Sequence, residues 1–247
     1  MKYLPIVAIF LASSAQAAPV YRTPAEALAA SRRAGSIKEG VKVLDRACRG
    51  SGGRALRGHP ILAKEADRLI AQAEPETRKR ALDLHRCFDD AGFLDKYVLP
   101  RLYDPDTGVQ AYAAEVSARL GLPAAVAPLL SRLKAKKAHC LDAEASADDV
   151  ELCVWLTYAP GASLEGADRT TRGLAASAAA EMALESPHPK VREVAVETLY
   201  AAKLRAHAST IKKLVKMEKK GAFAQPNSKA LLKRFSKRAK KLKRAKR

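Results

Sequence analysis

Strand-like patterns are missing from this sequence of 247 residues. Runs in which β-branched or aromatic residues alternate with polar ones do not recur along it, which excludes a β-sheet protein. Helix signals recur instead, as capping residues followed by Pro and by apolar residues at helical spacing. The sequence therefore predicts an all-α protein.

Long hydrophobic runs are also missing after the first residues. Arg, Lys, Asp or Glu interrupts every Ala-rich stretch, so no later segment approaches the roughly 20 apolar residues that a membrane span needs. We therefore expect a soluble mature protein with no transmembrane segment. The exception is the short apolar segment 3–12, which lies between Met1-Lys2 and an Ala-x-Ala sequence at residues 15–17. These parts are typical of a secretory signal cleaved after Ala17, and they predict a periplasmic or secreted protein.

Motifs that bind phosphates, dinucleotides or metal ions are absent from the sequence. Neither Gly-x-x-x-x-Gly-Lys nor Gly-x-Gly-x-x-Gly occurs, and no Cys-x-x-Cys pair is present to hold zinc. Residues 161–166 miss the Gly-x-Ser-x-Gly nucleophile elbow by one residue, and we interpret them as a flexible loop between helices. We therefore expect no catalytic residue, no cofactor and no metal site.

The cysteines predict disulfides. Cys48, Cys87, Cys140 and Cys153 would enter an oxidising compartment after export. Three pairings can be drawn. Pairing Cys48 with Cys87 and Cys140 with Cys153 closes the shortest loops, and it is our hypothesis. The acidic residues between Cys140 and Cys153 do not follow the calcium-loop pattern, so we interpret that segment as a disulfide-closed loop between helices.

Helix starts can be placed at several points. Thr23, Pro24 and Glu26 combine a capping hydroxyl, a Pro at the first helical position and an acid that can reach back. The same capping pattern predicts a start after Ser36. Further helices are expected to begin near Pro60, Pro75, Gly108, Pro123, Ser146, Asp168 and Pro189. This spacing of mostly about 15 residues suits pairs of short antiparallel helices stacked side by side.

Short patterns also repeat, and one of them is similar to a known family. Residues 98–102 and 126–130 share Val-x-Pro-x-Leu, and residues 211–215 have similar apolar spacing without the Pro. Residues 189–199 read Pro-x-Val-Arg-x-x-Ala-x-x-x-Leu, which resembles the signature of HEAT repeats. Residues 120–130 look like the turn and second helix of the same unit.

The resemblance covers about residues 75–217. It implies an α-solenoid, a curved stack of helix pairs whose concave face commonly binds a partner. The middle unit departs from the pattern, because Ala113 stands where Arg is expected. The resemblance implies no chemistry by itself.

Acidic residues are scarce at the C-terminal end. Residues 203–247 hold 18 Lys and Arg against one acid, Glu218, whereas the 202 residues before them hold 27 basic and 25 acidic side chains. Most of the net charge of +19 therefore lies in the last fifth of the chain. Apolar residues recur there at helical spacing, namely Leu231, Phe235, Ala239 and Leu242. The pattern predicts a cationic amphipathic helix that Asn227 or Ser228 could cap.

This basic segment is the predicted binding site. Its charge comes from Lys233, Arg234, Lys237, Arg238, Lys240, Lys241, Lys243 and Arg244, and its apolar anchors for a lipid interface would be Leu231, Phe235 and Leu242. Anionic lipid and a cell-wall polyanion fit such a segment. Nucleic acid fits less well, because the segment has a single aromatic residue on which a base could stack. In the alternative interpretation, the apolar stripe packs onto the preceding repeat.

The sequence therefore divides into a signal peptide (1–17), an N-terminal helical region (18–74), HEAT-like repeats (75–226) and a basic helix or tail (227–247). We expect an α-solenoid that acts as an exported noncatalytic scaffold and binds a protein partner or an anionic envelope component through its basic end. The alternative is a HEAT-like enzyme acting on nucleic acid or a cell-wall polymer, with the tail as docking element. Removal of residues 227–247 should leave the fold intact and abolish binding to anionic surfaces.

Overall fold

The computed structural model describes residues 21, 23–49 and 56–244, and the predicted signal at residues 1–17 lies outside them. The described part contains α-helices and short 3₁₀ or π turns and no β-strand. In chain order the elements are α1 (Pro24–Arg32), α2 (Ile37–Arg49), α4 (Pro60–Ile70), α5 (Pro75–Leu82), η1 (Asp83–Cys87), α6 (Asp90–Phe93), η2 (Leu94–Val98), η3 (Leu99–Tyr103), α7 (Thr107–Leu120), η4 (Pro123–Ala125), α8 (Val126–Ala135), α9 (Lys137–Leu141), α10 (Ala147–Ala162), α11 (Arg169–Glu185), α12 (Pro189–Ala201), η5 (Arg205–His207), α13 (Ala208–Lys219) and α14 (Lys229–Arg244). The predicted all-α class is confirmed.

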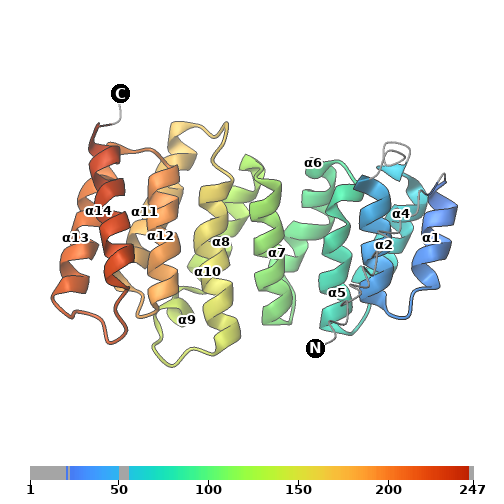
Figure 1. The fold of residues 1–247 in the computed structure, drawn as a ribbon, viewed down its shortest axis with the longest axis horizontal. Helices are drawn as coiled ribbons and strands as arrows, with labels where there is room; N and C mark the ends of the chain where they lie inside the picture. Colours follow the sequence, from blue (N-terminus) through green and yellow to red (C-terminus); the bar gives the residue numbers. More distant parts are fainter. Residues whose placement is uncertain (1–20, 22, 50–55, 245–247) are drawn as a thin grey trace, which may run out of the picture.

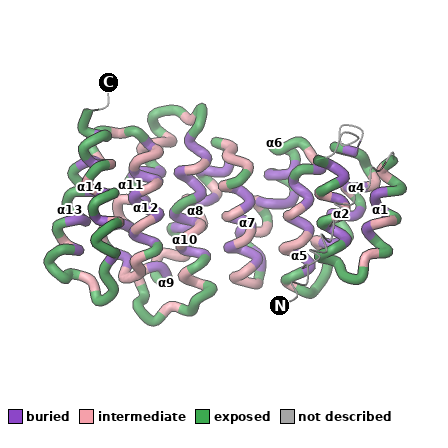
Figure 2. The backbone as a smooth tube through the Cα atoms, in the orientation of Figure 1, coloured by how far each residue is buried: buried purple, intermediate pink, exposed green. Residues whose placement is uncertain are grey.

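The helices lie side by side in a row along the longest axis of the molecule, with α1 at one end and α13 and α14 at the other (Figure 1). Consecutive helices pack on one another in the pairs α1 with α2, α11 with α12 and α13 with α14, and α10 lies between α7 and α12. The buried residues occur along the whole row (Figure 2) and form one continuous apolar core from Ala27 to Leu242.

Most predicted helix starts agree with the structure to within one residue. The Thr23 hydroxyl accepts a hydrogen bond from the Glu26 N–H at 3.2 Å, and the Ser36 hydroxyl accepts one from the Glu39 N–H, also at 3.2 Å. The two segments compared as Val-x-Pro-x-Leu repeats are not equivalent, however. Residues 98–102 lie in the π and 3₁₀ turns η2 and η3, whereas residues 126–130 begin helix α8. A shared five-residue pattern therefore did not predict a shared conformation.

A buried arginine occurs twice in the same arrangement. Arg78 in α5 donates to the Asp104 carboxylate at 2.7 Å and to the carbonyls of residues 72 and 73, which precede it by six and five positions. Arg192 in α12 donates to the Glu218 carboxylate at 2.8 Å and to the carbonyls of residues 186 and 187, again six and five positions earlier. In both cases the carboxylate follows its arginine by 26 residues. Each arginine therefore joins the turn before its own helix to a carboxylate 26 residues further along the chain.

A sequence signal for the first of these arginines was present but weak. Residues 75–81 read Pro-x-Thr-Arg-x-x-Ala, which matches residues 189–195 except that Thr77 replaces Val191. Both Thr77 and Val191 are buried. Burial raises the pKa of Asp104, but the hydrogen bonds from Arg78, Arg101 and the Asp106 N–H, together with the Arg78 charge, outweigh burial and hold that pKa below the ordinary value. The pair is therefore ionised near neutral pH.

The disulfide hypothesis is confirmed. Cys48 pairs with Cys87, which ties α2 to η1, and Cys140 pairs with Cys153, which ties α9 to α10. Both bridges are fully or almost fully buried. Disulfides of this kind persist in oxidising, extracytoplasmic compartments. Within the described residues no helix is both long and apolar enough to cross a bilayer.

Loss of the longer bridge should be costly. A Cys48→Ala/Cys87→Ala variant is expected to lose about 2–4 kcal/mol of unfolding free energy, because the bridge closes a chain segment of 39 residues in the unfolded state. The Cys140→Ala/Cys153→Ala variant, whose bridge spans 13 residues, should lose about 1 kcal/mol less. Urea denaturation of both variants measures the difference, and equal stability of wild type and the first variant would contradict the prediction.

Candidate polyanion-binding surface

Helix α14 is an ordered, capped helix that closes one end of the row. The Ser228 hydroxyl accepts a hydrogen bond from the Leu231 N–H at 3.3 Å, so Ser228 is the capping residue. Asn227, the other predicted cap, is buried and instead donates from its side chain to the Glu218 carboxylate at 2.7 Å and from its N–H at 2.9 Å. The Arg192–Glu218 pair therefore fixes the connection between α13 and α14.

The apolar stripe of α14 is turned towards the protein. Its buried members are Leu232, Phe235, Ala239 and Leu242, and α14 packs against α13, α12 and η5. Phe235 is 0% exposed and Leu242 is 2% exposed, while Leu231 is half-buried. The expectation that Phe235 and Leu242 anchor the helix in lipid is therefore wrong for this structure, whereas burial does not decide the role of Leu231. Burial of a large apolar side chain is worth about 1.5–3 kcal/mol, and the neighbouring helices supply that burial here.

Two of the eight predicted basic residues are bound to the body of the protein. Arg234 donates to Glu193 at 2.6 Å and to Glu197 at 3.1 Å. Arg238 forms an ion pair with Glu197 and lies over the ring of Tyr200, with 5.2 Å between the guanidinium carbon and the ring centroid. These two arginines attach α14 to α12, so they are not free to bind a ligand.

The other six, Lys233, Lys237, Lys240, Lys241, Lys243 and Arg244, are exposed, and none forms an ion pair within the described part of the chain. Four of these six residues lie on one side of α14, together with Lys229, the first residue of the helix. We call this set the basic face: Lys229, Lys233, Lys237, Lys240 and Arg244. At 100° per residue these five positions span only about 80° of the helix circumference, opposite the buried stripe.

Helix α13 adds further charge beside α14. Its exposed lysines are Lys212, Lys213, Lys216 and Lys219, and Lys220 follows directly. The single acid of residues 203–247, Glu218, is 4% exposed and is bonded to Arg192 and Asn227. No carboxylate of this segment therefore offsets the lysines at the surface, and the electrostatic potential there is strongly positive.

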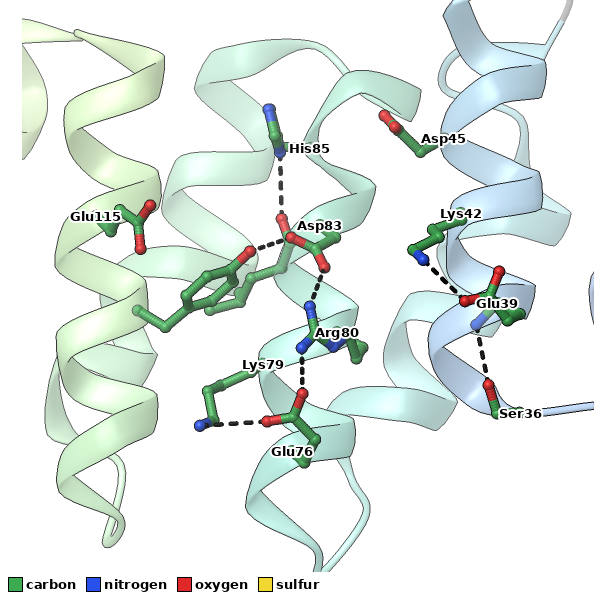
Figure 3. Close-up of polar contacts among 12 residues, drawn as sticks. Ser36, Glu39, Lys42, Asp45, Glu76, Lys79, Arg80, Asp83, His85 and Glu115 are labelled. Carbon is green, nitrogen blue, oxygen red and sulfur yellow. Dashed lines mark hydrogen bonds and ion pairs between the residues drawn. The ribbon is translucent and has the colours of Figure 1, made fainter.

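A second polar cluster lies between α5 and α7 (Figure 3). Tyr112 donates to the Asp83 carboxylate, which also accepts from Arg80 at 3.1 Å, and Arg80 pairs with Glu76. Burial and the neighbouring Asp83 carboxylate raise the pKa of Tyr112 to about 12. The phenol therefore stays protonated at neutral pH and acts as a hydrogen-bond donor that joins α7 to η1. The cluster holds helices together and has no activated nucleophile.

The near-match to a nucleophile elbow is also structural. Gly161 lies inside α10, and a Cβ on it would meet the Cα atom of Thr198 at 2.8 Å, so the glycine allows α10 and α12 to approach closely. Ser163 is fully buried and Leu164 is almost so. The interpretation of the whole segment as a loop is therefore wrong for Gly161 and Ala162, which end α10, while residues 163–166 lie between α10 and α11 as predicted.

Comparison of the chain with protein-family models, with curated proteins and with solved structures gave no match. Among the residues that the structure describes, no group of three or more His, Cys, Asp or Glu side chains is placed to hold a metal ion. The basic face is the most distinctive part of the described surface.

Proposed function

We propose that this chain is an exported, noncatalytic scaffold, an α-solenoid of HEAT-like helix pairs, that binds an anionic envelope polymer or lipid surface through the basic face of α14. The observation that carries the proposal is the row of exposed cations on α14 without carboxylate partners, on a helix whose apolar stripe is already covered. Such a surface attracts closely spaced phosphates without inserting into a bilayer.

The repeated arginine supports the solenoid part of the proposal. Arg78 and Arg192 have the same two carbonyl acceptors relative to their own positions and the same 26-residue spacing to a carboxylate. Solenoids are built from units that contact mainly their neighbours, and a contact repeated in this way is what such units would share. The row of helices agrees with that arrangement (Figure 1).

Export is supported by the signal-like residues 1–17 and by two disulfides. An envelope location offers polyanions of two kinds, phosphate-bearing lipids and cell-wall polymers. The buried Phe235 and Leu242 favour binding by charge alone, so the interaction should weaken steeply as salt is added.

A charge-reversal series tests the proposal. Lys233→Glu/Lys237→Glu/Lys240→Glu should lower affinity for anionic vesicles or cell-wall polymer by roughly 100-fold or more, at about 1 kcal/mol for each lysine near an anionic surface. The matched control, Lys38→Glu/Lys64→Glu/Lys134→Glu, makes the same change in net charge at exposed lysines on other helices. Cosedimentation at several salt concentrations measures both. Equal losses in the two variants would show that net charge alone acts, and would refute a site on α14.

A further inference from the structure

A pocket with four basic residues lies at the edge of the row next to α14. Its volume is about 1090 Å³. Arg169 and Arg172 line it from the first turn of α11, and Lys203 and Arg205 line it from the connection between α12 and α13. The remaining lining residues are alanines, one glycine and one leucine, so the wall contains no carboxylate. Residues some 35 positions apart in the sequence thus bring four positive charges to one concave surface.

Two of these guanidinium groups are held in place by main-chain carbonyls. Arg172 Nε donates to the carbonyl of Ala167 at 3.1 Å. Arg205 donates from Nε at 3.1 Å and from Nη2 at 2.9 Å to the carbonyl of Lys243 in the last turn of α14. A carbonyl orients a guanidinium without neutralising it. By contrast, carboxylates pair with the arginines of α4, α5 and α12, such as Arg68, Arg80 and Arg192.

The acids nearest in sequence form no ion pair with the cations of the pocket. The Asp168 carboxylate accepts a hydrogen bond from the Thr171 N–H at 2.6 Å, as the cap of α11, and this bond lowers its pKa. Glu165 is exposed in the preceding loop and does not line the pocket. In the described part of the chain, Arg169, Arg172, Lys203 and Arg205 form no ion pair.

Lys203 contributes an independent observation. Its φ of 56° is the only positive φ of a non-glycine residue in the described ranges. Lys203 follows the end of α12, where the left-handed conformation normally selects glycine because a Cβ is strained there. Here a lysine occupies that position and lines the pocket. The chain therefore tolerates backbone strain at the point where the side chain adds a positive charge.

We infer that this pocket binds a multiply charged phosphate group, such as a diphosphate or a phosphomonoester. Three guanidinium groups can each bind two phosphate oxygens, which a point charge cannot do. The volume lies at the upper end of the range for small-molecule sites and accommodates a phosphate with an attached sugar or glycerol. Arg205 connects the pocket to the end of α14, so it would hold a phosphate of a polymer or headgroup that lies along the basic face. The inference thus rests on the proposed function and adds the ligand chemistry.

The test uses inorganic pyrophosphate as the probe and isothermal titration calorimetry on the full chain. Arg169→Gln/Arg172→Gln/Lys203→Gly should weaken pyrophosphate binding at least about 10-fold, the loss of roughly one good charged contact. The matched control, Arg33→Gln/Arg46→Gln/Lys38→Gln, removes the same charge at the exposed residue that follows α1 and at two exposed positions of α2, and should bind like wild type.

A single Lys203→Gly variant controls for loss of binding that is caused by misfolding of the triple variant. Glycine adopts a positive φ without strain, so the melting temperature should stay the same or rise while pyrophosphate affinity falls several-fold. Unchanged affinity in both pocket variants, or no binding by wild type at millimolar pyrophosphate, would overturn the inference. Citrate binding as tightly as pyrophosphate would also overturn it, because a carboxylate site needs no phosphate.

Two further experiments are needed. One distinguishes a lipid headgroup from a soluble polymer as the source of the phosphate, and the other tests the pocket independently of the basic face. Pyrophosphate that displaces the protein from phosphatidic acid vesicles would support a lipid headgroup as the ligand, and displacement only from a soluble phosphate polymer would support the polymer. The Lys233→Glu/Lys237→Glu/Lys240→Glu variant should lose vesicle binding and keep pyrophosphate binding to within about threefold, because the pocket residues are intact. If the basic-face variant keeps wild-type vesicle binding while the pocket variants still lose pyrophosphate affinity, the proposed function is refuted and the pocket inference is supported.

Discussion

An Arg192→Met variant should be less stable than the wild-type chain by about 3–5 kcal/mol, the cost of breaking a buried ion pair by removing one partner. Arg192 and Glu218 are both 0% exposed at their side chains. Without the guanidinium, the Glu218 carboxylate stays buried with only Asn227 as a donor, and the carbonyls of residues 186, 187 and 225 lose a partner. Urea denaturation followed by circular dichroism at 222 nm measures the loss.

Two companion variants separate charge from shape at this site. Arg192→Lys keeps the charge but cannot reach all four acceptors, so it should recover less than half of the lost stability. Arg192→Met/Glu218→Met removes both charges, leaves no buried carboxylate, and should be more stable than Arg192→Met alone. A loss below about 1 kcal/mol in Arg192→Met would contradict the structural role given to this residue.

A Phe235→Ala variant should lose about 3–5 kcal/mol of unfolding free energy, as expected for a fully buried phenylalanine. Phe235 is 0% exposed in the contact of α14 with α12 and α13, where Ile211 and Leu214 are also buried. The truncation leaves a cavity that packed helices fill only in part. Thermal and urea unfolding of the full chain measure the change.

Leu231→Ala is the matched control, because Leu231 lies on the same helix and is only half-buried. It should cost clearly less than Phe235→Ala. If Phe235→Ala were as stable as wild type, α14 would be a detachable tail, as one interpretation of the sequence held. The packing instead predicts that deletion of residues 227–247 would expose apolar surface of α12 and α13 and destabilise the fold, contrary to the expectation from the sequence.

Local features of the fold could be predicted well from the sequence. Helix starts at Thr23–Pro24, Ser36 and Pro189 follow from capping groups and from the fixed φ of proline, which act within a few residues. The pairing of Cys48 with Cys87 followed from loop length, and the structure confirms it. These are features whose causes lie close together in the chain.

Features that depend on distant residues could not be predicted. The spacing of Phe235 and Leu242 shows that α14 has an apolar stripe, but not whether a bilayer or a neighbouring helix covers it. The acceptors of Arg78 and Arg192 are main-chain carbonyls and a carboxylate 26 residues away. Every residue has a main-chain carbonyl, so the sequence does not indicate which carbonyls accept these hydrogen bonds. The four-cation pocket arises only because α11 and the α12–α13 connection lie next to each other.

The exposed side of α14 also affects whether copies of the protein associate end to end at high concentration. Helical rows with an uncovered apolar terminus tend to join end to end and grow into filaments. Here the terminal helix buries its own stripe and presents Lys233, Lys237 and Lys240 to the solvent. Another copy approaching this terminus with its own α14 meets charge of the same sign, so elongation is disfavoured most strongly in dilute buffer, where counterions screen least.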